Sequence, residues 1–508
     1  MLSQNEPQDN YSKKWLAFIG IALLSFGCYL DYTVVNVALP TIQQELQLSL
    51  TSLQWVMNIY FLSLCMLATI MGRLGDLFGR RYCFYIGAGI FAIASVIAGC
   101  SSNASWLIVG RLLQGISAAI VLPLGPSLLP ASFPEKNRAR AIALLGSMGG
   151  MALALGPVLG GIIVTHWGWR SIFFINVPIV LCGYLFCFKS VKESIAKQKN
   201  VKLDWLGMLL LGLAIGGIIL SLIHSQMIGW SHFITLFYFV VGIIACIVLF
   251  KVESKHTNPL IDFSDFSNLL FYAGALLCFL AGVLSAVALF FDPLYLQIIR
   301  NLSPQASGLI LFAIPIAVFG VAFIVEWLIA RTSIIHTIFI GMGLAILSAV
   351  LHLFFTSMTP LWFVIMAFIL LGSMWAMGNT VPIIAAQTAV GVHRLSVATG
   401  TMVMMFNMGG SIGLAISVVI YQAVASKSLR TIFESGYRQI GESQFAYLEK
   451  LISNPTQSLL NSTNATIHTI FNDVFIHGFS GVMWFIVIIS VISFLSIFIS
   501  KIINREST

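Results

Sequence analysis

Charge is what this 508-residue sequence lacks most, because only 9% of its residues are Asp, Glu, Lys or Arg, against roughly 25% in an ordinary soluble domain. So few charged side chains cannot coat a soluble globule of this length. The composition therefore excludes a soluble enzyme, a nucleic-acid-binding protein and a disordered chain. The net charge of +8 does not indicate a nucleic-acid partner, since the basic residues have another explanation given below.

Catalytic and redox patterns are also missing. The 8 cysteines fall in or beside apolar runs without CxxC or metal-ligand spacing, so we interpret them as packing residues rather than a disulfide framework. No Ser/His/Asp constellation and no GxxxxGK[ST] phosphate loop occurs. We therefore expect no enzyme activity, no bound metal or cofactor, and no use of ATP as the energy source.

Apolar residues are abundant, at 58% of the chain, and they gather in long runs. A membrane-spanning helix needs about 20 mostly apolar residues. Fourteen segments qualify: 15–39, 52–72, 82–100, 105–130, 139–165, 170–188, 205–224, 232–250, 269–298, 305–330, 334–355, 360–388, 396–424 and 475–500. The first is too long for a signal-peptide core and lacks a cleavage site, so we expect it to be retained.

The basic residues indicate how the chain is oriented. With the N-terminus placed in the cytoplasm, 19 of the 26 Lys and Arg fall in inside segments, and in the short outside loops only Arg170 and Arg300 remain. This is a strong positive-inside bias. We predict a multi-pass protein of the cell (inner) membrane with both termini in the cytoplasm and the lipid bilayer as its surroundings.

The spans group into a predicted domain plan. We expect a cytoplasmic tail (1–14), a six-helix bundle (15–190), a central linker with two extra spans (191–267), a second six-helix bundle (268–500) and a short tail (501–508). The second bundle includes the one long polar segment between spans, an outside loop over 425–474. Leu429, Ile432 and Phe433 in that loop suggest interfacial helices.

An internal repeat supports this plan. Shifting the chain against itself by 254 residues aligns Gly87 with Gly341, Arg140 with Arg394 and Gly156 with Gly410. Repeats about an axis along the membrane normal are one architecture of secondary transporters, which bind substrate near the midplane between the halves. The repeat therefore predicts a cavity between the two bundles.

Five motifs carry a resemblance to a known family. They are LDYTVVNVALP at 30–40, GRLGDLFGRR at 72–81, GRLLQG at 110–115, GPVLGG at 156–161 with Gly146 and Gly150 before it, and WRSIFFINVP at 169–178. In this order and spacing they resemble the drug:proton antiporters of the major facilitator superfamily. The second half resembles the family mainly through PLYLQ at 293–297 and GGSIG at 409–413. The resemblance implies an all-α polytopic fold of two six-helix bundles plus two central helices, fourteen in all.

Two oppositely charged residues are predicted at one depth in the membrane. Asp31 lies about 10 Å from the outer end of the first span and Arg111 about 9–10 Å from that of the fourth. A lone charge at this depth costs at least about 2.5–3.5 kcal/mol, so we expect an ion pair facing a wet cavity. Our hypothesis is that Asp31 is the exchangeable proton site and Arg111 its fixed partner. The alternative is a permanent ion pair that only fixes helix packing.

The loop after the second span resembles the family's gating motif. By resemblance, Gly72, Asp76, Gly79, Arg80 and Arg81 are expected to lock the two halves together, with Asp76 near a helix N-terminus. Leu77 departs from the family pattern, which has Arg there, so a charge relay through this position is not carried over. The alternative for Arg80 and Arg81 alone is plain positive-inside anchoring.

The fifth span is rich in glycine. Small residues let helices approach closely, and a proline can bend a span when neighbours satisfy the freed carbonyl. The residues concerned are Gly146, Gly150, Gly156, Pro157, Gly160 and Gly161. They predict either a half-to-half contact that seals the cavity or ordinary helix packing, and the resemblance favours the first.

Other residues have weaker assignments. Asp292 and Glu326 are candidates for contact with a cationic ligand or for a second proton site, although each lies close enough to an interface to be solvated. We interpret His336, His352 and His393 as surface or packing residues. Methionines and aromatics at 374–377 and 402–408 could line a site for varied apolar ligands, or face lipid and neighbouring helices.

The sequence thus predicts a monomeric exporter that exchanges protons for amphiphilic drugs or other toxic small molecules, driven by the proton gradient alone. A dedicated exporter of one metabolite, such as a siderophore or an organic acid, is an alternative, because the motifs describe the coupling machinery and not the ligand. A non-transporting membrane sensor is a third, and it would need a structured soluble domain within 425–474.

Overall fold

The computed structural model describes residues 13–48, 50–188, 190–191, 193, 204–255, 259, 262–391, 394–434, 442–453 and 465–506, and in them it contains helices and no strand. The first half holds α1 (Lys14–Leu46), α2 (Leu50–Phe78), α3 (Arg80–Gly99), α4 (Ala104–Ser132), α5 (Glu135–Trp167), α6 (Ser171–Phe174) and α7 (Asn176–Phe188). Two further helices, α8 (Trp205–Ile228) and α9 (Phe233–Glu253), follow it.

The second half begins with a 3-10 turn, η2 (Phe263–Ser267), and α10 (Leu269–Leu294), which continues as the π-helical segment η3 (Tyr295–Ile299). It then holds α11 (Pro304–Leu311), α12 (Ala313–Arg331), α13 (Ile334–His352), α14 (Leu361–Ala389), α15 (Leu395–Glu434), α16 (Glu442–Ser453) and α18 (Ala465–Glu506).

These helices confirm the predicted all-α membrane fold. In the described residues, 12 helices are long and apolar enough to cross a membrane, or 14 when each of two bent pairs is taken as one span. The bent pairs are Asn137–Leu153 with Val158–Trp167 and Ala306–Val321 with Phe323–Arg331. Helices suit this role because every backbone N–H and C=O is satisfied within the segment, where lipid offers no partner.

Side-chain caps define several helix starts. Each cap accepts a hydrogen bond from a backbone N–H of the first turn, a group that has no partner inside the helix. The caps are Asn103 for α4, Asp204 for α8, Asn268 for α10, Ser303 for α11 and Ser333 for α13. Short polar residues between the apolar runs therefore begin the helices and separate them.

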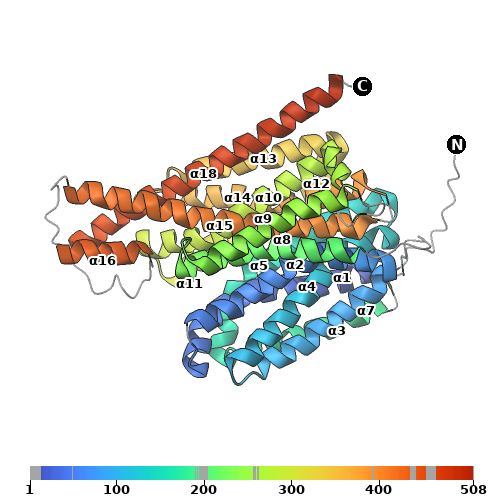
Figure 1. The fold of residues 1–508 in the computed structure, drawn as a ribbon, viewed down its shortest axis with the longest axis horizontal. Coiled ribbons are helices and arrows are strands. Elements are labelled where there is room, and N and C mark those ends of the chain that lie inside the picture. The colour runs from blue at the N-terminus through green and yellow to red at the C-terminus, as the bar shows by residue number, and fades with distance from the viewer. Residues whose placement is uncertain are drawn as a thin grey trace.

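The two halves meet along two seams. On one side α2 packs against α15, and on the other α5 packs against α12 and α14. The helices α8 and α9 pack on each other, and α8 also contacts α2 and α15, so this pair covers the first seam. Figure 1 shows the first half in blue to cyan and the second in yellow to red, with the green α8 and α9 lying along them.

The outer surface of the central pair is apolar. Phe233, Phe237, Ile244 and Phe250 on α9 are each more than half exposed. An exposed apolar face of this size is a liability in water but matches lipid. The pair therefore faces the bilayer rather than the interior of either bundle.

The polar segment 425–474 differs from the predicted loop. α15 continues to Glu434, and α18 already begins at Ala465. Leu448 and Leu451 of α16 are buried in the same core cluster as Leu429 and Phe471, and Figure 1 shows α16 beside the extended helices at one end of the molecule. Within the described residues of this segment, the two flanking helices therefore extend beyond the predicted ends of their spans, and α16 packs against them.

Candidate functional site

The first half contains a buried acidic centre. Asp31 of α1 and Arg111 of α4 are both fully buried and form an ion pair. The Gln114 amide, one turn after Arg111, donates to Asp31 Oδ1 at 3.0 Å, and the Asn176 amide of α7 donates to the same atom at 2.8 Å. Three donors from two helices therefore surround one carboxylate.

Further contacts hold the guanidinium of Arg111 in place. Its Nε donates to the carbonyl oxygen of Val56 at 3.1 Å, and its Cζ lies 4.4 Å from the centre of the Tyr60 ring, a cation–π distance. The Tyr60 hydroxyl in turn donates to the carbonyl oxygen of Cys28 at 2.8 Å. These contacts hold the guanidinium between α2 and α4, where it pairs with Asp31 of α1.

The surroundings of this pair differ from the prediction. Asp31 and Arg111 were expected to face a wet cavity, but they lie inside the first bundle, among α1, α4 and α7. Gln114 and Asn176 were quoted within motifs and given no role, yet both bind Asp31 directly. A polar amide in an apolar span was the available signal, because a buried amide needs a hydrogen-bonding partner.

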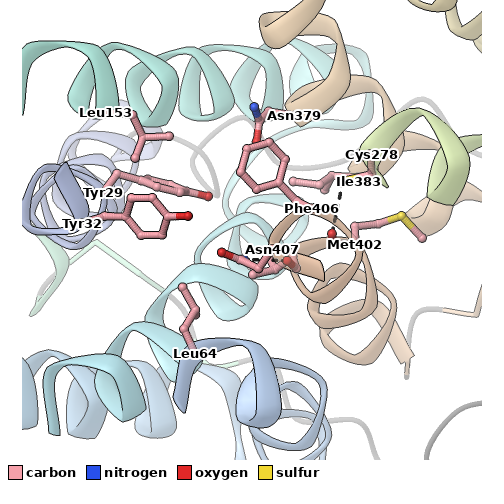
Figure 2. Close-up of a pocket in the computed structure, with 11 residues that line it drawn as sticks. Tyr29, Tyr32, Leu64, Leu153, Cys278, Asn379, Ile383, Met402, Phe406 and Asn407 are labelled. Atoms are coloured by element: carbon pink, nitrogen blue, oxygen red, sulfur yellow. Dashed lines mark hydrogen bonds between the residues drawn. The ribbon is translucent and has the colours of Figure 1, made fainter. Parts of the chain in front are cut away.

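A cavity does lie between the halves, as the repeat predicts (Figure 2). Its lining comprises Tyr29, Tyr32, Leu64 and Leu153 from the first half and Cys278, Asn379, Ile383, Met402, Val403, Phe406 and Asn407 from the second. This lining contains two phenols, two amides and no ionic side chain. The lining therefore offers apolar surface together with hydrogen-bond donors and acceptors.

The predicted methionine and aromatic lining is mostly elsewhere. Met402 and Phe406 reach the cavity. Met374, Trp375 and Met377 are buried in the core of the second half instead. Tyr29 and Tyr32, which flank Asp31 in the sequence, take the place predicted for these residues.

A second constellation joins the two halves at the end that carries Arg80, Arg140 and Arg394, here called the basic end. Asp76 of α2 is 1% exposed and accepts hydrogen bonds from the backbone N–H groups of Ser396 at 3.2 Å and Val397 at 3.1 Å. These groups open α15, where the helix dipole favours a negative charge. Asp76 also binds Arg80 Nη2 at 2.7 Å.

The other residues of the predicted gating motif divide into two sets, those that contact the second half and those that do not. Gly72 lies against α15, where an added Cβ would come within 2.9 Å of the Ser396 carbonyl carbon. Gly79 has φ +110°, a conformation that favours glycine, and it turns the chain from α2 into α3. Arg80 is buried and also donates to the Ser396 hydroxyl, so plain membrane anchoring does not describe it. Arg81 instead donates to the carbonyl of Phe188 within its own half.

The glycines of α5 serve two different contacts. An added Cβ at Gly146 would lie 2.5 Å from Thr380 Oγ1, and one at Gly150 would lie 2.6 Å from Val318 Cγ1, so these two glycines admit helices of the second half. At Gly160 it would meet the backbone of Val34 on α1 at 2.9 Å. Gly161 has open space. Only the first two therefore form the half-to-half contact.

A side chain of α1 bonds the carbonyl oxygen that the bend in α5 leaves without its helical partner. The two segments of the helix meet at 50°, and Pro157 lacks the N–H that would bond the carbonyl of Leu153. The Thr33 hydroxyl donates to that carbonyl oxygen at 2.8 Å, and Thr33 also packs on Gly156. The bent span is thus tied to a residue two positions from Asp31.

Asp292 and Glu326 lie in contrasting surroundings. Glu326 is partly exposed and its carboxylate lies 3.8 Å from Arg140, an ion pair at the surface of the basic end. Asp292 is fully buried, with an oxygen 3.7 Å from Nε2 of His352. The alternative that Asp292 is merely solvated does not describe it. Of the histidines interpreted as surface or packing residues, His352 is buried and His336 is exposed. His393 lies outside the described residues.

Comparison with known proteins places this geometry in a family. The family model described as Major Facilitator Superfamily matches residues 21–205 and 205–414. The chain is 30% identical over 465 residues to the Multidrug resistance protein Stp of Mycobacterium tuberculosis, covering 89% of this chain and 82% of the relative. It is 30% identical over 416 residues to the Tetracenomycin C resistance and export protein of Streptomyces glaucescens, covering 80% and 76%.

A solved structure supports the fold at low sequence identity. The human organic anion transporter MFSD10 (TETRAN) superposes with a TM-score of 0.57 at 14% identity, over 96% of this chain and 100% of that one. The family match spans both bundles and includes the acidic centre, the gating motif and the bent glycine-rich helix. This multi-pass membrane chain, with its cavity between two joined halves, belongs to the major facilitator superfamily of transporters.

Proposed function

We propose that this protein is a proton-coupled antiporter that exports amphiphilic organic compounds across the cell membrane. The observation that carries the proposal is the carboxylate of Asp31, which is buried and accepts from three side-chain donors, on the same helix as the Tyr29 and Tyr32 that line a cavity between the halves. The names of two relatives refer to drug resistance, and one of them also refers to export. Family membership supports transport as the general activity, and the buried carboxylate of Asp31 supports the coupling of that transport to protons.

Protonation of Asp31 has a structural consequence. Oδ1 accepts from Gln114 and Asn176, and Oδ2 pairs with Arg111. A proton on either oxygen would put an O–H against an N–H donor, so at least one of these contacts must break. Loading a proton therefore loosens α1 from α4 or α7, and losing it draws them together.

A chain of aromatic contacts links the cavity to this event. Tyr32 lines the cavity, and its ring centre lies 6.0 Å from that of Tyr60. Tyr60 stacks under the guanidinium of Arg111. A ligand that displaces Tyr32 thus shifts Tyr60 and, through it, the position of Arg111 beside Asp31. Cargo binding and protonation of Asp31 can therefore compete, because each favours a different conformation.

The cavity lining favours a particular class of cargo. Its phenols and amides offer both donors and acceptors, and Phe406 and Met402 offer a polarisable surface. Because the lining lacks an ionic side chain, we propose neutral aromatic compounds with hydroxyl or carbonyl groups as the best substrates. Strongly charged compounds would lose hydration without gaining a counter-ion.

Transport requires the halves to separate at the basic end. The contact of Asp76 with the start of α15 closes that end in the present conformation. By the positive-inside rule we propose that the basic end and both termini face the cytoplasm. Cargo then enters after the Asp76 contacts break and leaves when they have re-formed.

Reconstitution in liposomes tests the proposal. With an imposed pH gradient, the wild type should move a neutral aromatic polyketide against its concentration gradient and dissipate the pH gradient as it does so. Asp31→Asn should insert and fold but lose gradient-driven movement, while Glu45→Gln, which alters an exposed ion pair with Arg170 within the first half, should behave as the wild type. Gradient-driven transport retained by Asp31→Asn would refute the role of Asp31.

A dedicated exporter of one compound remains the second candidate. It is favoured by the name of a relative that refers to one antibiotic, tetracenomycin C. A panel of neutral, cationic and anionic aromatic probes in the same liposomes separates the two functions. Movement of several unrelated neutral probes supports the broad exporter, and movement of one supports the dedicated one.

A further inference from the structure

A second buried acid lies in the other half of the molecule. Asp292, near the end of α10, is fully buried, and in the described structure neither of its carboxyl oxygens has a hydrogen-bond partner. The one ionisable group close to it is His352 at the end of α13, whose Nε2 lies 3.7 Å from Asp292 Oδ1. His352 is itself only 3% exposed.

The tautomer of His352 follows from its other nitrogen. Nδ1 lies 2.7 Å from the carbonyl oxygen of Ser348, and a carbonyl can only accept, so Nδ1 carries a hydrogen. In the neutral imidazole Nε2 is then a bare acceptor. A bare acceptor facing an ionised carboxylate is repulsive, so the pair needs one more proton between them.

Aromatic side chains surround the ring of His352. The ring centre of Phe355, in the turn before α14, lies 4.5 Å from that of His352, and the ring centre of Phe368 on α14 lies at 5.8 Å. The ring centre of Phe479 on α18 lies at 6.3 Å. From η3, the Tyr295 hydroxyl is occupied by the carbonyl of Thr356 at 2.8 Å.

The remaining polar groups nearby do not supply a counter-charge. Arg300, beyond η3, donates to the carbonyl of Thr359. Tyr421 of α15, whose phenol is neutral, has its ring tilted against that of Phe291 with centres 5.3 Å apart. Within the described residues, His352 is therefore the only cationic partner that Asp292 has.

Charge accounting decides how many protons this site holds. Without a labile proton the pair leaves one negative charge in a dry aromatic shell, and with two it leaves one positive charge, both costly. With one proton it is neutral overall, as a carboxylic acid beside imidazole or as a carboxylate beside imidazolium. The geometry therefore selects the one-proton state.

We propose that Asp292 and His352 form a second proton-binding site, which holds one exchangeable proton between Asp292 Oδ1 and His352 Nε2. The proposal rests on the proposed proton-coupled function and adds a proton to its cycle. Loading takes one proton from water and release returns it to water, with no other bond made or broken. Pro293 and the π-helical η3 follow Asp292 directly, and such irregular turns are where a helix can deform to admit water.

Infrared difference spectroscopy of the purified full-length protein over a pH titration tests the site directly. We expect a protonated-carboxyl signal that disappears in Asp292→Asn and whose titration midpoint shifts in His352→Gln. The same signal should persist in Asp31→Asn. A titration spectrum of Asp292→Asn that superimposes on that of the wild type would overturn the proposal.

Proton counting in liposomes gives a second readout. Asp292→Asn should move one proton fewer per cargo molecule than the wild type while still transporting. The variant D292L/H352L, which keeps the site filled and apolar, should show the same loss, and a wild-type ratio in it would mean that the pair is only structural. If the wild type moved no protons at all, the proposed function would fail, and the infrared titration would still decide whether the pair binds a proton.

Discussion

The two halves of this transporter each bury one acid on their first long helix, and they neutralise it in opposite ways. Asp31 is met by a permanent cation and two amides, whereas Asp292 is met by one histidine and aromatic rings. A fixed guanidinium keeps the first acid compensated when it is ionised. In the site that we propose, the second acid is neutralised by a proton that it shares with His352, so both acids can bind a proton but their ionised forms meet different partners.

The two acids lie at a similar distance from the ends of their spans, but the internal repeat does not place them at equivalent positions. Asp31 lies eight residues before Leu39, the end of its span, and Asp292 lies seven before Ile299. The offset of 254 places Ser285, not Asp292, opposite Asp31. Asp292 is thus about two helical turns further along a longer span. The two halves share a helical scaffold, but their buried acids do not occupy equivalent positions of the repeat.

The sharpest way to break this comparison is to remove each partner. Arg111→Met should destabilise the protein by about 3–5 kcal/mol, because it leaves Asp31 buried without its counter-ion. Thermal unfolding in detergent measures the loss. Combining it with Asp31→Asn should recover part of the stability, and a single variant as stable as the wild type would contradict the description of the pair.

His352→Leu provides the matching change in the second half. We expect a smaller loss, about 1–3 kcal/mol, since Asp292 can take up a proton and become neutral when its partner is gone. The same unfolding assay, run in parallel, compares the two halves. A loss equal to that of Arg111→Met would mean that Asp292 stays ionised in the fold.

The seam between the halves can be tested by a pair of glycines on α5. Gly150→Ala places a methyl group 2.6 Å from Val318 across the seam, and such overpacking costs about 1–3 kcal/mol. Gly161→Ala enters open space and should be neutral. Transport rate and unfolding temperature are measured for both, and equal behaviour of the two variants would remove the assigned role of Gly150.

The smallest effect is expected from an exposed ion pair, which serves as a reference for the buried ones. Glu45 accepts from Arg170 and from Trp169 Nε1, and the Arg170 hydrogen bond lowers the pKa of Glu45 below its ordinary value. A lowered pKa adds stability above the ordinary pH range of glutamate and loses it as the pH falls through the lowered pKa. The difference in unfolding temperature between wild type and Glu45→Gln should therefore shrink in acid.

Much of the site was predictable because membrane energetics are severe. Asp31 and Arg111 could be paired from depth alone, since each charge in an apolar span needs a partner. Gln114 and Asn176 could not be assigned, because the direction that each side chain takes depends on the rotation of α4 and α7 against α1. The hydrogen bond from the Thr33 hydroxyl to the carbonyl oxygen of Leu153 could not be predicted either. Pro157 indicates only that this carbonyl needs another donor, not which residue supplies it.

Hydropathy and charge act locally along the chain, so the amino-acid sequence alone predicts the apolar spans and the basic end. It also predicts that acids at certain depths need partners. Which partner each acid has depends on the tertiary structure, since Asp292 and His352 are 60 residues apart on helices with no shared motif. Packing brings such groups together through the rotation and tilt of whole helices, and no local pattern in the chain encodes that quantity.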